Sequence, residues 1–468
     1  MIDAMGCAPA RQETWGKAAR HRVMWCLAAT FCQLQALLPW PAMAQQTTLP
    51  SPLHLEQAIA LALENNPDLE AAQARIDQAA ATIREVRSAF FPHLQARLHY
   101  LRSNHPMVSD ALLVSQRRLD MTGDINHPGS IAEYRPEMLL SWSLFEGGRR
   151  LMESKAARLA REATALDKTA VGNDMAASVT TAFYALAEAP KALVVARQAS
   201  ATVARELELA QSRLQHGTAL RSEVLSLQAR LEEARLDEIS AANAVALANT
   251  SLATLLALDT QTDLVLAEED IKPLPVPPAL PELLIQAYSN RPELLAANKD
   301  QERWEKTVSA ARAALWPSLD AFALYGRDSN ELGLSNHKDN YMVGMNAKLD
   351  IFTGFATSAK IQQARARLAE AQAKARAVRL KTEKEVKEAY LNLTEALARR
   401  KAAAAQERAA SAALDLVQKE YRAGVAPVTR FLEAQTQAQA AQLRLLATGY
   451  DVQITQADLH RASGLGVR

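Results

Sequence analysis

The sequence predicts a mainly α-helical protein with a small β part, built from duplicated long helical hairpins and four short extended segments. The first observation is the stretch from Phe355 to Leu465, which is rich in Ala, Gln, Glu, Arg and Leu, all strong helix formers. The second is an internal duplication of the chain. The third is a set of segments in which apolar and polar residues alternate. Only 16 Gly and 5% aromatic residues indicate that any sheet is a minor part of the fold.

The helix-forming stretch turns back near its middle. Gly424 and Pro427 follow one another closely there, and this pair ends one helix and starts the next. We therefore expect a long antiparallel helical hairpin. Its first arm, Phe355 to Tyr421, would reach on the order of 100 Å at 1.5 Å per residue.

The N-terminus has the features of a secretory signal peptide over residues 1–44. Basic residues precede an apolar run from Val23 to Leu38, and Ala42-Met43-Ala44 forms a small-x-small cleavage site. A short membrane anchor is the weaker alternative, because the run is shorter than the roughly 18 residues of a spanning helix. The three cysteines, Cys7, Cys26 and Cys32, all lie inside this leader. The mature chain therefore has no disulfide, thiolate metal site or Cys nucleophile.

The rest of the chain is an internal repeat. Three landmarks recur at a spacing of 225 residues: Asn66-Pro67 with Arg291-Pro292, Phe91-Pro92 with Trp316-Pro317, and Tyr100 with Tyr325. Three more recur at 207: Phe145 with Phe352, Gly217 with Gly424, and Leu258 with Leu465. We therefore expect a first repeat at 45–258, a proline-rich linker at 259–281 and a second repeat at 282–468, each reading helix, strand, loop, strand, long helix, turn and helix.

Four segments alternate apolar and polar residues with period two. Their apolar residues are Leu94, Ala96, Leu98 and Tyr100; Met138, Leu140, Trp142 and Leu144; Leu319, Ala321, Ala323 and Tyr325; and Val343, Met345, Ala347 and Leu349, the last set within Tyr341 to Ile351. Each segment has about the ten residues that a tilted strand needs to cross a bilayer. A small soluble sheet with one face packed on a helix fits the strands alone equally well.

The signal peptide and the repeat favour the membrane. Four strands cannot close a barrel, and open sheet edges are not tolerated in hydrocarbon. Several chains must then share one barrel, and three would give twelve strands. The stretches Ser103–Glu133 and Asp328–Asn340 would be the extracellular loops.

The helices carry coiled-coil seams. One seam contains Leu220, Val224, Leu227 and Leu231, and the other contains Leu414, Val417 and Tyr421. An ordinary soluble coiled coil has the same periodicity. Pro190 interrupts the first long arm and is expected to kink or break it.

The composition does not favour nucleic-acid binding or catalysis. Lys and Arg total 53 against 52 Asp and Glu, with no basic run interleaved with aromatic residues. No motif of a metalloprotease, a serine hydrolase or a phosphate-binding loop occurs, so we expect neither enzyme activity nor a cofactor. Gly147-Gly148-Arg149-Arg150 could bind an anion at a helix start, but a strand-to-helix turn explains it better. We expect His93 and His99 to line a polar lumen rather than bind a metal.

Taken in order and in duplicate, these motifs resemble the TolC family of outer membrane efflux proteins. The resemblance rests on the Asn/Arg-Pro-acid-Leu helix starts, the Phe/Trp-Pro strand entries, the Leu-Phe-x-Gly strand exit at Leu144 to Gly147 and Tyr421-Arg-Ala-Gly424. It covers essentially the whole mature chain. It implies a homotrimer with a twelve-stranded transmembrane β-barrel in the outer membrane of a Gram-negative bacterium. The barrel would continue into an α-barrel across the periplasm, where a periplasmic adaptor and an inner-membrane pump engage the closed tip.

The resemblance also implies a periplasmic gate at the helix turns. Tyr421 matches the family's latch tyrosine, Glu223 its acidic partner and Glu433 one acid of the aperture. Arg430 stands at the other aperture acid and has the opposite sign, and Ala426 replaces a latch arginine. Without the resemblance, Tyr421 could be a seam residue, and Glu223 and Glu433 could belong to a solvated helix face. The turns that would dock the adaptor contain Gly217, Thr218, Gly424, Val425 and Pro427.

We therefore expect an outer membrane channel that passively conducts the cargo of a tripartite efflux or type I secretion system. A soluble periplasmic coiled-coil adaptor or scaffold is the alternative, and the duplication with four bilayer-length strands argues against it. The sequence does not name the cargo, which could be a drug, a metal ion, a siderophore or a protein toxin, nor the class of pump.

Overall fold

The computed structural model describes residues 51–120, 122, 124, 126–267, 277–331 and 338–466. The expected signal peptide at 1–44 lies outside the described residues. The elements of the first half of the chain are α2 (Leu55–Asn65), α3 (Pro67–Ser88), β1 (His93–Ser103), α4 (Pro106–Ser115), β2 (Ile131–Glu146), α5 (Arg149–Gln215) and α6 (Arg221–Leu255). Those of the second half are α7 (Leu280–Asn290), α8 (Pro292–Arg312), a 3-10 turn (Ala313–Leu315), β3 (Ser318–Arg327), β4 (Asp339–Lys348), α9 (Ala356–Arg422) and α10 (Val428–Ser463).

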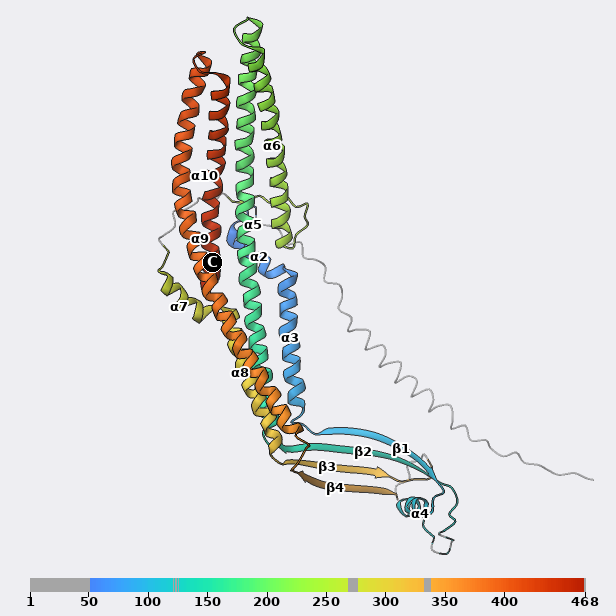
Figure 1. Ribbon diagram of the computed structural model, residues 1–468. Coiled ribbons are helices and arrows are strands. Elements are labelled where there is room, and N and C mark those ends of the chain that lie inside the picture. The colour runs from blue at the N-terminus through green and yellow to red at the C-terminus, as the bar shows by residue number, and fades with distance from the viewer. Residues whose placement is uncertain are drawn as a thin grey trace, which may run out of the picture. The chain divides into compact units, whose positions relative to one another are not determined.

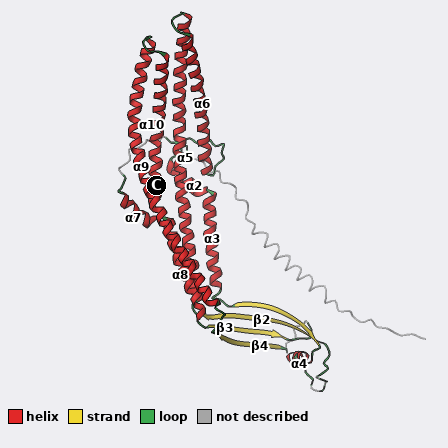
Figure 2. Ribbon diagram, in the orientation of Figure 1, coloured by secondary structure: helices red, strands yellow, loops and turns green. Residues whose placement is uncertain are grey.

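The four strands form one antiparallel sheet in the order β1-β2-β3-β4, next to the ends of the long helices (Figures 1 and 2). Its register aligns the apolar residues of all four strands on one face. Leu94 pairs with Leu140, Leu140 with Ala323, and Ala323 with Val343. This face is largely exposed in the single chain, since Val343 is 73% and Leu94 65% accessible. The predicted alternation is therefore correct, and nothing in the described chain covers its apolar side.

Two details of the sheet differ from expectation. β4 ends at Lys348, so Leu349 to Ile351 lie outside the strand instead of completing it. The connection between β1 and β2 contains the helix α4, where we expected only a loop. Pro106 occupies the first turn of α4 and the following residues are mostly apolar, which is a helix-start pattern that the long-loop interpretation overlooked.

The long helices form a layer four helices wide. Next to the sheet, α3 contacts α5, α5 contacts α8, and α8 contacts α9. Towards the turns, α6 contacts α5, α5 contacts α10, and α10 contacts α9. The first hairpin is therefore α5–α6 and the second is α9–α10, and they lie against each other through α5 and α10.

Helix α5 continues through Pro190, so of the expected kink or break, the break does not occur. The proline is exposed, while Phe183 and Leu186 on the preceding two turns are buried and anchor the helix. The hydroxyl of Tyr450 on α10 donates to the carbonyl of Ala187 at 3.3 Å, beside the position where the proline lacks an N–H. Packing against α10 thus stabilises the helix at the point where its own hydrogen bonding is interrupted.

The predicted seams form one buried cluster near the turns. Val224, Leu227 and Leu231 of α6 pack with Val417 and Tyr421 of α9. Leu220 does not belong to the seam, because it is the N-cap of α6 and is 72% exposed. The heptad spacing extends one turn beyond the point where the helix begins, and periodicity alone does not mark that boundary.

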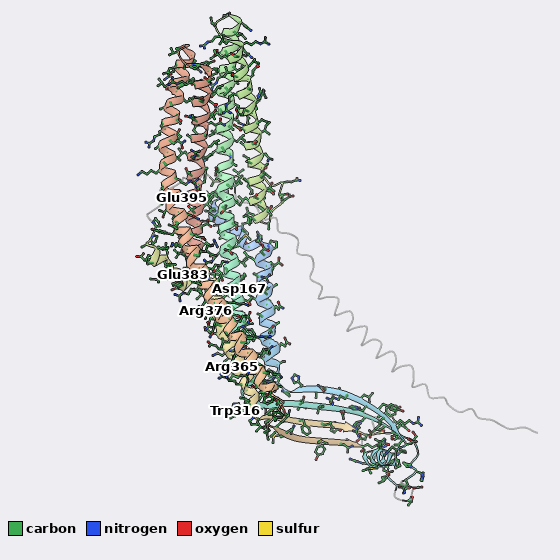
Figure 3. All side chains as sticks on the ribbon, viewed as in Figure 1. Asp167, Trp316, Arg365, Arg376, Glu383 and Glu395 are labelled. Carbon is green, nitrogen blue, oxygen red and sulfur yellow. The ribbon has the colours of Figure 1, made fainter. Side chains whose placement is uncertain are left out.

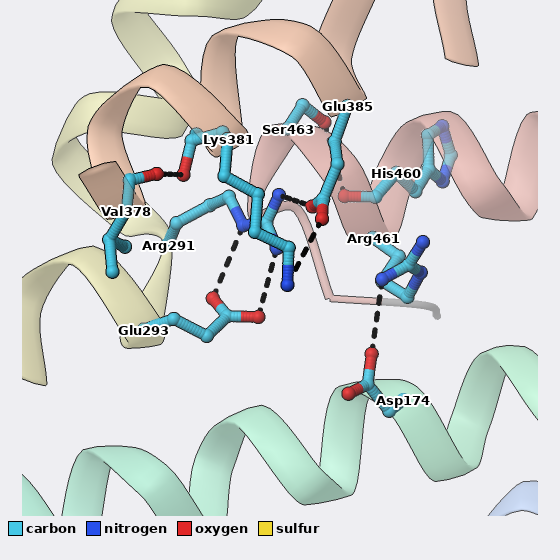
Figure 4. Close-up of polar contacts among 10 residues, drawn as sticks. Asp174, Arg291, Glu293, Val378, Lys381, Glu385, His460, Arg461 and Ser463 are labelled. Atoms are coloured by element: carbon cyan, nitrogen blue, oxygen red, sulfur yellow. Dashed lines mark hydrogen bonds and ion pairs between the residues drawn. The ribbon is translucent and has the colours of Figure 1, made fainter. Parts of the chain in front are cut away.

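A buried charge network joins the start of α8 to α9 (Figure 4). The side chain of Arg291 is only 5% exposed, pairs with Glu293 at 2.9 Å and also pairs with Glu385 of α9. Nearby, Arg461 of α10 pairs with Asp174 of α5 at 3.1 Å. The Arg461–Asp174 pair connects the two hairpins, and the Arg291–Glu385 pair connects α8 to the second hairpin.

Candidate functional site

The two hairpins end in turns that require glycine. Gly217 has φ +69° and Gly424 has φ +77°, a left-handed conformation in which other residues are strained. Thr218 closes the first turn by donating from its hydroxyl to the carbonyl of Arg213 at 3.1 Å. Val425 is 78% exposed and Pro427 is the N-cap of α10. All five predicted turn residues therefore lie on the exposed ends of the hairpins.

Close to the turns, the structure brings Tyr421 and Glu223 together. The hydroxyl of Tyr421, on α9, donates to the carboxylate of Glu223, on α6. The ring of Tyr421 is buried and stacks on Phe431, with 5.3 Å between the ring centroids. Burial, followed by the hydrogen bond to the Glu223 carboxylate, raises the pKa of Tyr421. Tyr421 is thus both a seam residue and a protonated hydrogen-bond donor between the two hairpins.

A buried carboxylate that the sequence reasoning missed lies beside this contact. Glu206 of α5 is fully buried, and its Oε1 accepts from Nε of Arg422 and from Nε2 of Gln418, both at 2.9 Å. Both donors are on α9. The signal was present in the sequence, since Glu206 falls on the apolar stripe formed by Val203, Leu207 and Ala210.

An arginine from α5 supplies positive charge next to Tyr421. The guanidinium carbon of Arg213 lies 5.8 Å from the centroid of the Tyr421 ring, and its Nη2 donates to the carbonyl of Arg422 at 2.6 Å. Ala426, which stands where the family pattern has an arginine, is buried in the same apolar cluster. The cation near the tyrosine therefore comes from the first hairpin rather than from the turn of the second.

The other two predicted gate residues lie apart from this cluster. Arg430 is exposed, and its Nη1 lies 3.7 Å from Oε2 of Glu420. Glu433 is exposed and, in the part of the chain that the structure describes, has neither an ion pair nor a side-chain hydrogen bond. Both side chains are available to solvent or to another chain.

The minor sequence candidates have structural explanations. Arg149 and Arg150 both pair with Glu146, at 2.6 and 2.9 Å, so each side chain of the Gly-Gly-Arg-Arg turn has an acidic partner. His99 contacts Glu137 at 3.2 Å. Among the described residues, no group of three or more His, Cys, Asp or Glu side chains could hold a metal ion.

The family model of the outer membrane efflux proteins matches residues 58–258 and 283–465. The chain belongs to this family. The sheet with its exposed apolar face and the paired hairpins are therefore those of an outer membrane channel, which extends into the periplasm of a Gram-negative bacterium and passively conducts the cargo of efflux or secretion systems.

Individual relatives span nearly the whole chain. Protein CyaE of Bordetella pertussis is 30% identical over 415 residues, 88% of this chain and 84% of the relative. The outer membrane protein TolC of Vibrio cholerae is 24% identical over 442 residues, which cover 92% of this chain and 96% of the relative. The crystal structure of CusC shares the fold, with a TM-score of 0.76 at 20% identity over 91% of this chain and 98% of that one. Membership of a family of outer membrane efflux proteins decides against the soluble adaptor.

Proposed function

We propose that three copies of this chain close into one channel, with a twelve-stranded barrel in the outer membrane and a helical tunnel gated at the hairpin turns. The observation that carries the proposal is the sheet. It has an exposed apolar face in register across four strands, and β1 and β4 at its two edges. A four-stranded sheet with such a face is stable in lipid only if other strands pair with both edges.

The helices support the same closure. The helix α6, at one border of the four-helix layer, exposes an apolar stripe that the single chain leaves uncovered: Leu225, Leu236, Ile239 and Leu247. The helix α9 lies at the other border and exposes Leu380, Leu391 and Leu416. A head-to-tail arrangement in which α6 of one copy meets α9 of the next would bury both sets and close a ring. β1 and α3 lie at the same border of the chain as α6, and β4 lies at the same border as α9.

Aromatic side chains gather where the helices meet the sheet. Trp316, labelled in Figure 3, lies at this junction and is 65% exposed. Phe91, Phe352 and Phe355 are also exposed, between 67% and 75%. Aromatic girdles mark the interfaces of transmembrane barrels, so we assign this junction to the periplasmic surface of the outer membrane.

We propose that Tyr421 and Glu223 latch the two hairpins in the closed channel, with Arg430 and Glu433 near the aperture. Opening would separate α9 from α6 and break the Tyr421–Glu223 hydrogen bond. Arg213, Arg422 and Glu206 would strengthen the closed form from the α5 side. The exposed turns at Gly217 and Thr218, and from Gly424 to Pro427, would contact a periplasmic adaptor bound to an inner-membrane pump.

We also propose the division into repeats at 45–258 and 282–468, joined by the linker 259–281. The described elements support it, because helix, helix, strand, strand and two long helices occur twice in that order, apart from α4. The helix α7 begins at Leu280, so the last two linker residues are helical.

Relatives are named for resistance to fusaric acid and for efflux of toluene and antibiotics, and we propose that the pump selects the cargo.

Conductance of the purified protein in planar bilayers tests the channel and its latch together. We expect a small closed-state conductance for the wild type and a higher passive leak for Glu223→Ala, which removes the acceptor of the Tyr421 hydroxyl. Glu232→Ala is the matched control, since this glutamate is 68% exposed and pairs with Arg235 on its own helix. Chemical cross-linking should yield bands up to three chains. A monomer that permeabilises no vesicles contradicts the channel proposal, and an unchanged leak in Glu223→Ala contradicts the latch.

A further inference from the structure

A buried arginine joins the two hairpins away from their turns. Arg230 lies on α6, and its side chain is 8% exposed. Its Nε donates to Oε1 of Gln435 at 3.2 Å, and its Nη2 donates to Oε1 of Gln439 at 2.9 Å. Both glutamines lie on α10 and are buried. Arg230 therefore connects the first hairpin to the second through two buried hydrogen bonds.

The charge of Arg230 is compensated on its own helix. Its Nη1 lies 2.8 Å from Oε2 of Glu233, one turn further along α6. The α10 partners are neutral amides, and Nε2 of Gln439 also donates to Asp237 of α6 at 3.3 Å. Hydrogen bonds from a charged donor are stronger than those between neutral groups. Because both amides are neutral, separating α6 from α10 leaves no charge stranded on α10.

The Arg230 contact lies further from the hairpin ends than the Tyr421–Glu223 latch does. Arg230 follows Glu223 by seven residues, which is about 10 Å along a helix. The latch and the Arg230 contact therefore lie two helical turns apart, with the latch nearer the hairpin ends. In the latch, Tyr421 is buried but Glu223 is partly exposed, whereas Arg230 and both of its glutamine partners are buried. Water reaches the outer contact more easily than the inner one.

We propose that Arg230 is a positioning residue that holds α6 against α10 while the Tyr421–Glu223 latch opens, and so limits how far the hairpins separate. The inference rests on the proposed gate. Separation that begins at the turns stops at Arg230, because continuing it would break two buried hydrogen bonds of a charged donor. The width of the open aperture is then set by this contact rather than by the latch.

Three variants measured in planar bilayers test the proposal: Glu223→Gln, Arg230→Met and the two combined. With the latch intact, Arg230→Met should leave the leak close to that of the wild type. Glu223→Gln alone should raise it. The combined variant should open wider, so its single-channel conductance should exceed that of Glu223→Gln and its total leak should rise further. A combined variant that leaks no more than Glu223→Gln overturns the role of Arg230.

The same contact can be removed from the α10 side. Gln435→Leu with Gln439→Leu should reproduce Arg230→Met in the Glu223→Gln background, and adding Arg230→Met to them should produce no further leak. Arg235→Met is the matched control on α6, since Arg235 is 58% exposed and pairs with Glu232. If Arg230→Met fails to form a heat-modifiable oligomer, the variant with Gln435→Leu and Gln439→Leu tests the proposal instead, because Arg230 stays paired with Glu233 in it. A Glu223→Gln channel without increased leak contradicts the latch itself, which separates the failure of the gate from that of Arg230.

Discussion

At the scale of single residues, buried charged side chains between helices fix the relative positions of the helices, in addition to the apolar seams. Arg291, Glu206 and Arg230 each lie within the helical layer and each connect two helices. Burying such groups is favourable only when their partners are in place, and removing one partner leaves the other unpaired. These contacts therefore fix the relative positions of helices that seams of alanine and leucine would allow to slide.

Replacing Arg291, in the charge network of Figure 4, tests whether a buried charge and its partners contribute to stability. We expect Arg291→Met to lower the free energy of unfolding by about 3 kcal/mol at pH 7, because Glu293 and Glu385 lose their buried partner. Lys299→Met is the control, with an expected effect below about 1 kcal/mol, since Lys299 is about one-third exposed. Circular dichroism of the helices during denaturation in detergent measures both. Equal effects in the two variants would contradict a special role for Arg291.

The pH dependence of the same variant has a defined sign. Burial raises the pKa of Glu293, but hydrogen bonds from Arg291 outweigh it, so the folded pKa lies below the ordinary value of 4.5. This contribution to stability is complete above pH 4.5 and is lost as the pH falls through the folded pKa. The difference between the wild type and Arg291→Met should therefore narrow on acidification below pH 4.5. A constant difference would exclude the Arg291–Glu293 pair as its origin.

At the scale of elements, the length of a helix depends on its neighbours as well as on its own sequence. Pro190 should end or bend an isolated helix, yet α5 runs for 67 residues from Arg149 to Gln215. Phe183 and Leu186, on the two turns before Pro190, belong to a buried cluster, and Tyr450 of α10 donates to the carbonyl of Ala187. Tertiary packing thus compensates for a local defect that costs roughly 3 kcal/mol in an isolated helix.

Pro190→Ala should restore the missing helical hydrogen bond. We expect the free energy of unfolding to rise by about 1–3 kcal/mol, with no loss of conductance. Pro67→Ala is the matched control, because Pro67 occupies the first position of α3, where the N–H would lack a helical partner anyway. Denaturation followed by circular dichroism compares the two variants. Destabilisation by Pro190→Ala would mean that the proline ring itself contributes packing that alanine cannot replace.

At the scale of the whole molecule, the two faces of the sheet define its environment. The apolar face carries Val343 and Met345, both more than 70% exposed, whereas Glu137 on the opposite face is buried against its neighbours. A soluble protein would bury the apolar face and expose the polar one. An apolar face left exposed on β1 and β4 is that of a transmembrane sheet facing lipid, and we propose that the polar face lines a lumen shared with other copies of the chain.

A charge placed on each face of β4 tests the assignment. Val343→Arg should cost about 2–4 kcal/mol on the lipid side and reduce the heat-modifiable oligomer recovered from outer membranes. Asn346→Arg lies on the polar face of the same strand and should assemble normally while changing ion selectivity. Gel mobility with and without heating, together with bilayer recordings, measures both effects. Equal tolerance of the two substitutions would argue against lipid on the apolar face.

The sequence by itself determined the long hairpin arms, the four strands with their two faces and the glycine turns. Helical and strand periodicities are local properties, so residues a few positions apart reveal them. The pairing of Tyr421 with Glu223 was implied only by the family resemblance. Only the tertiary structure decided that α5 passes through Pro190, that Leu220 leaves the seam, and that Glu206, Arg213 and Arg230 bind across the hairpins. The contacts of Glu206, Arg213 and Arg230 join residues about 200 positions apart, where burial and hydrogen bonding outweigh local propensity.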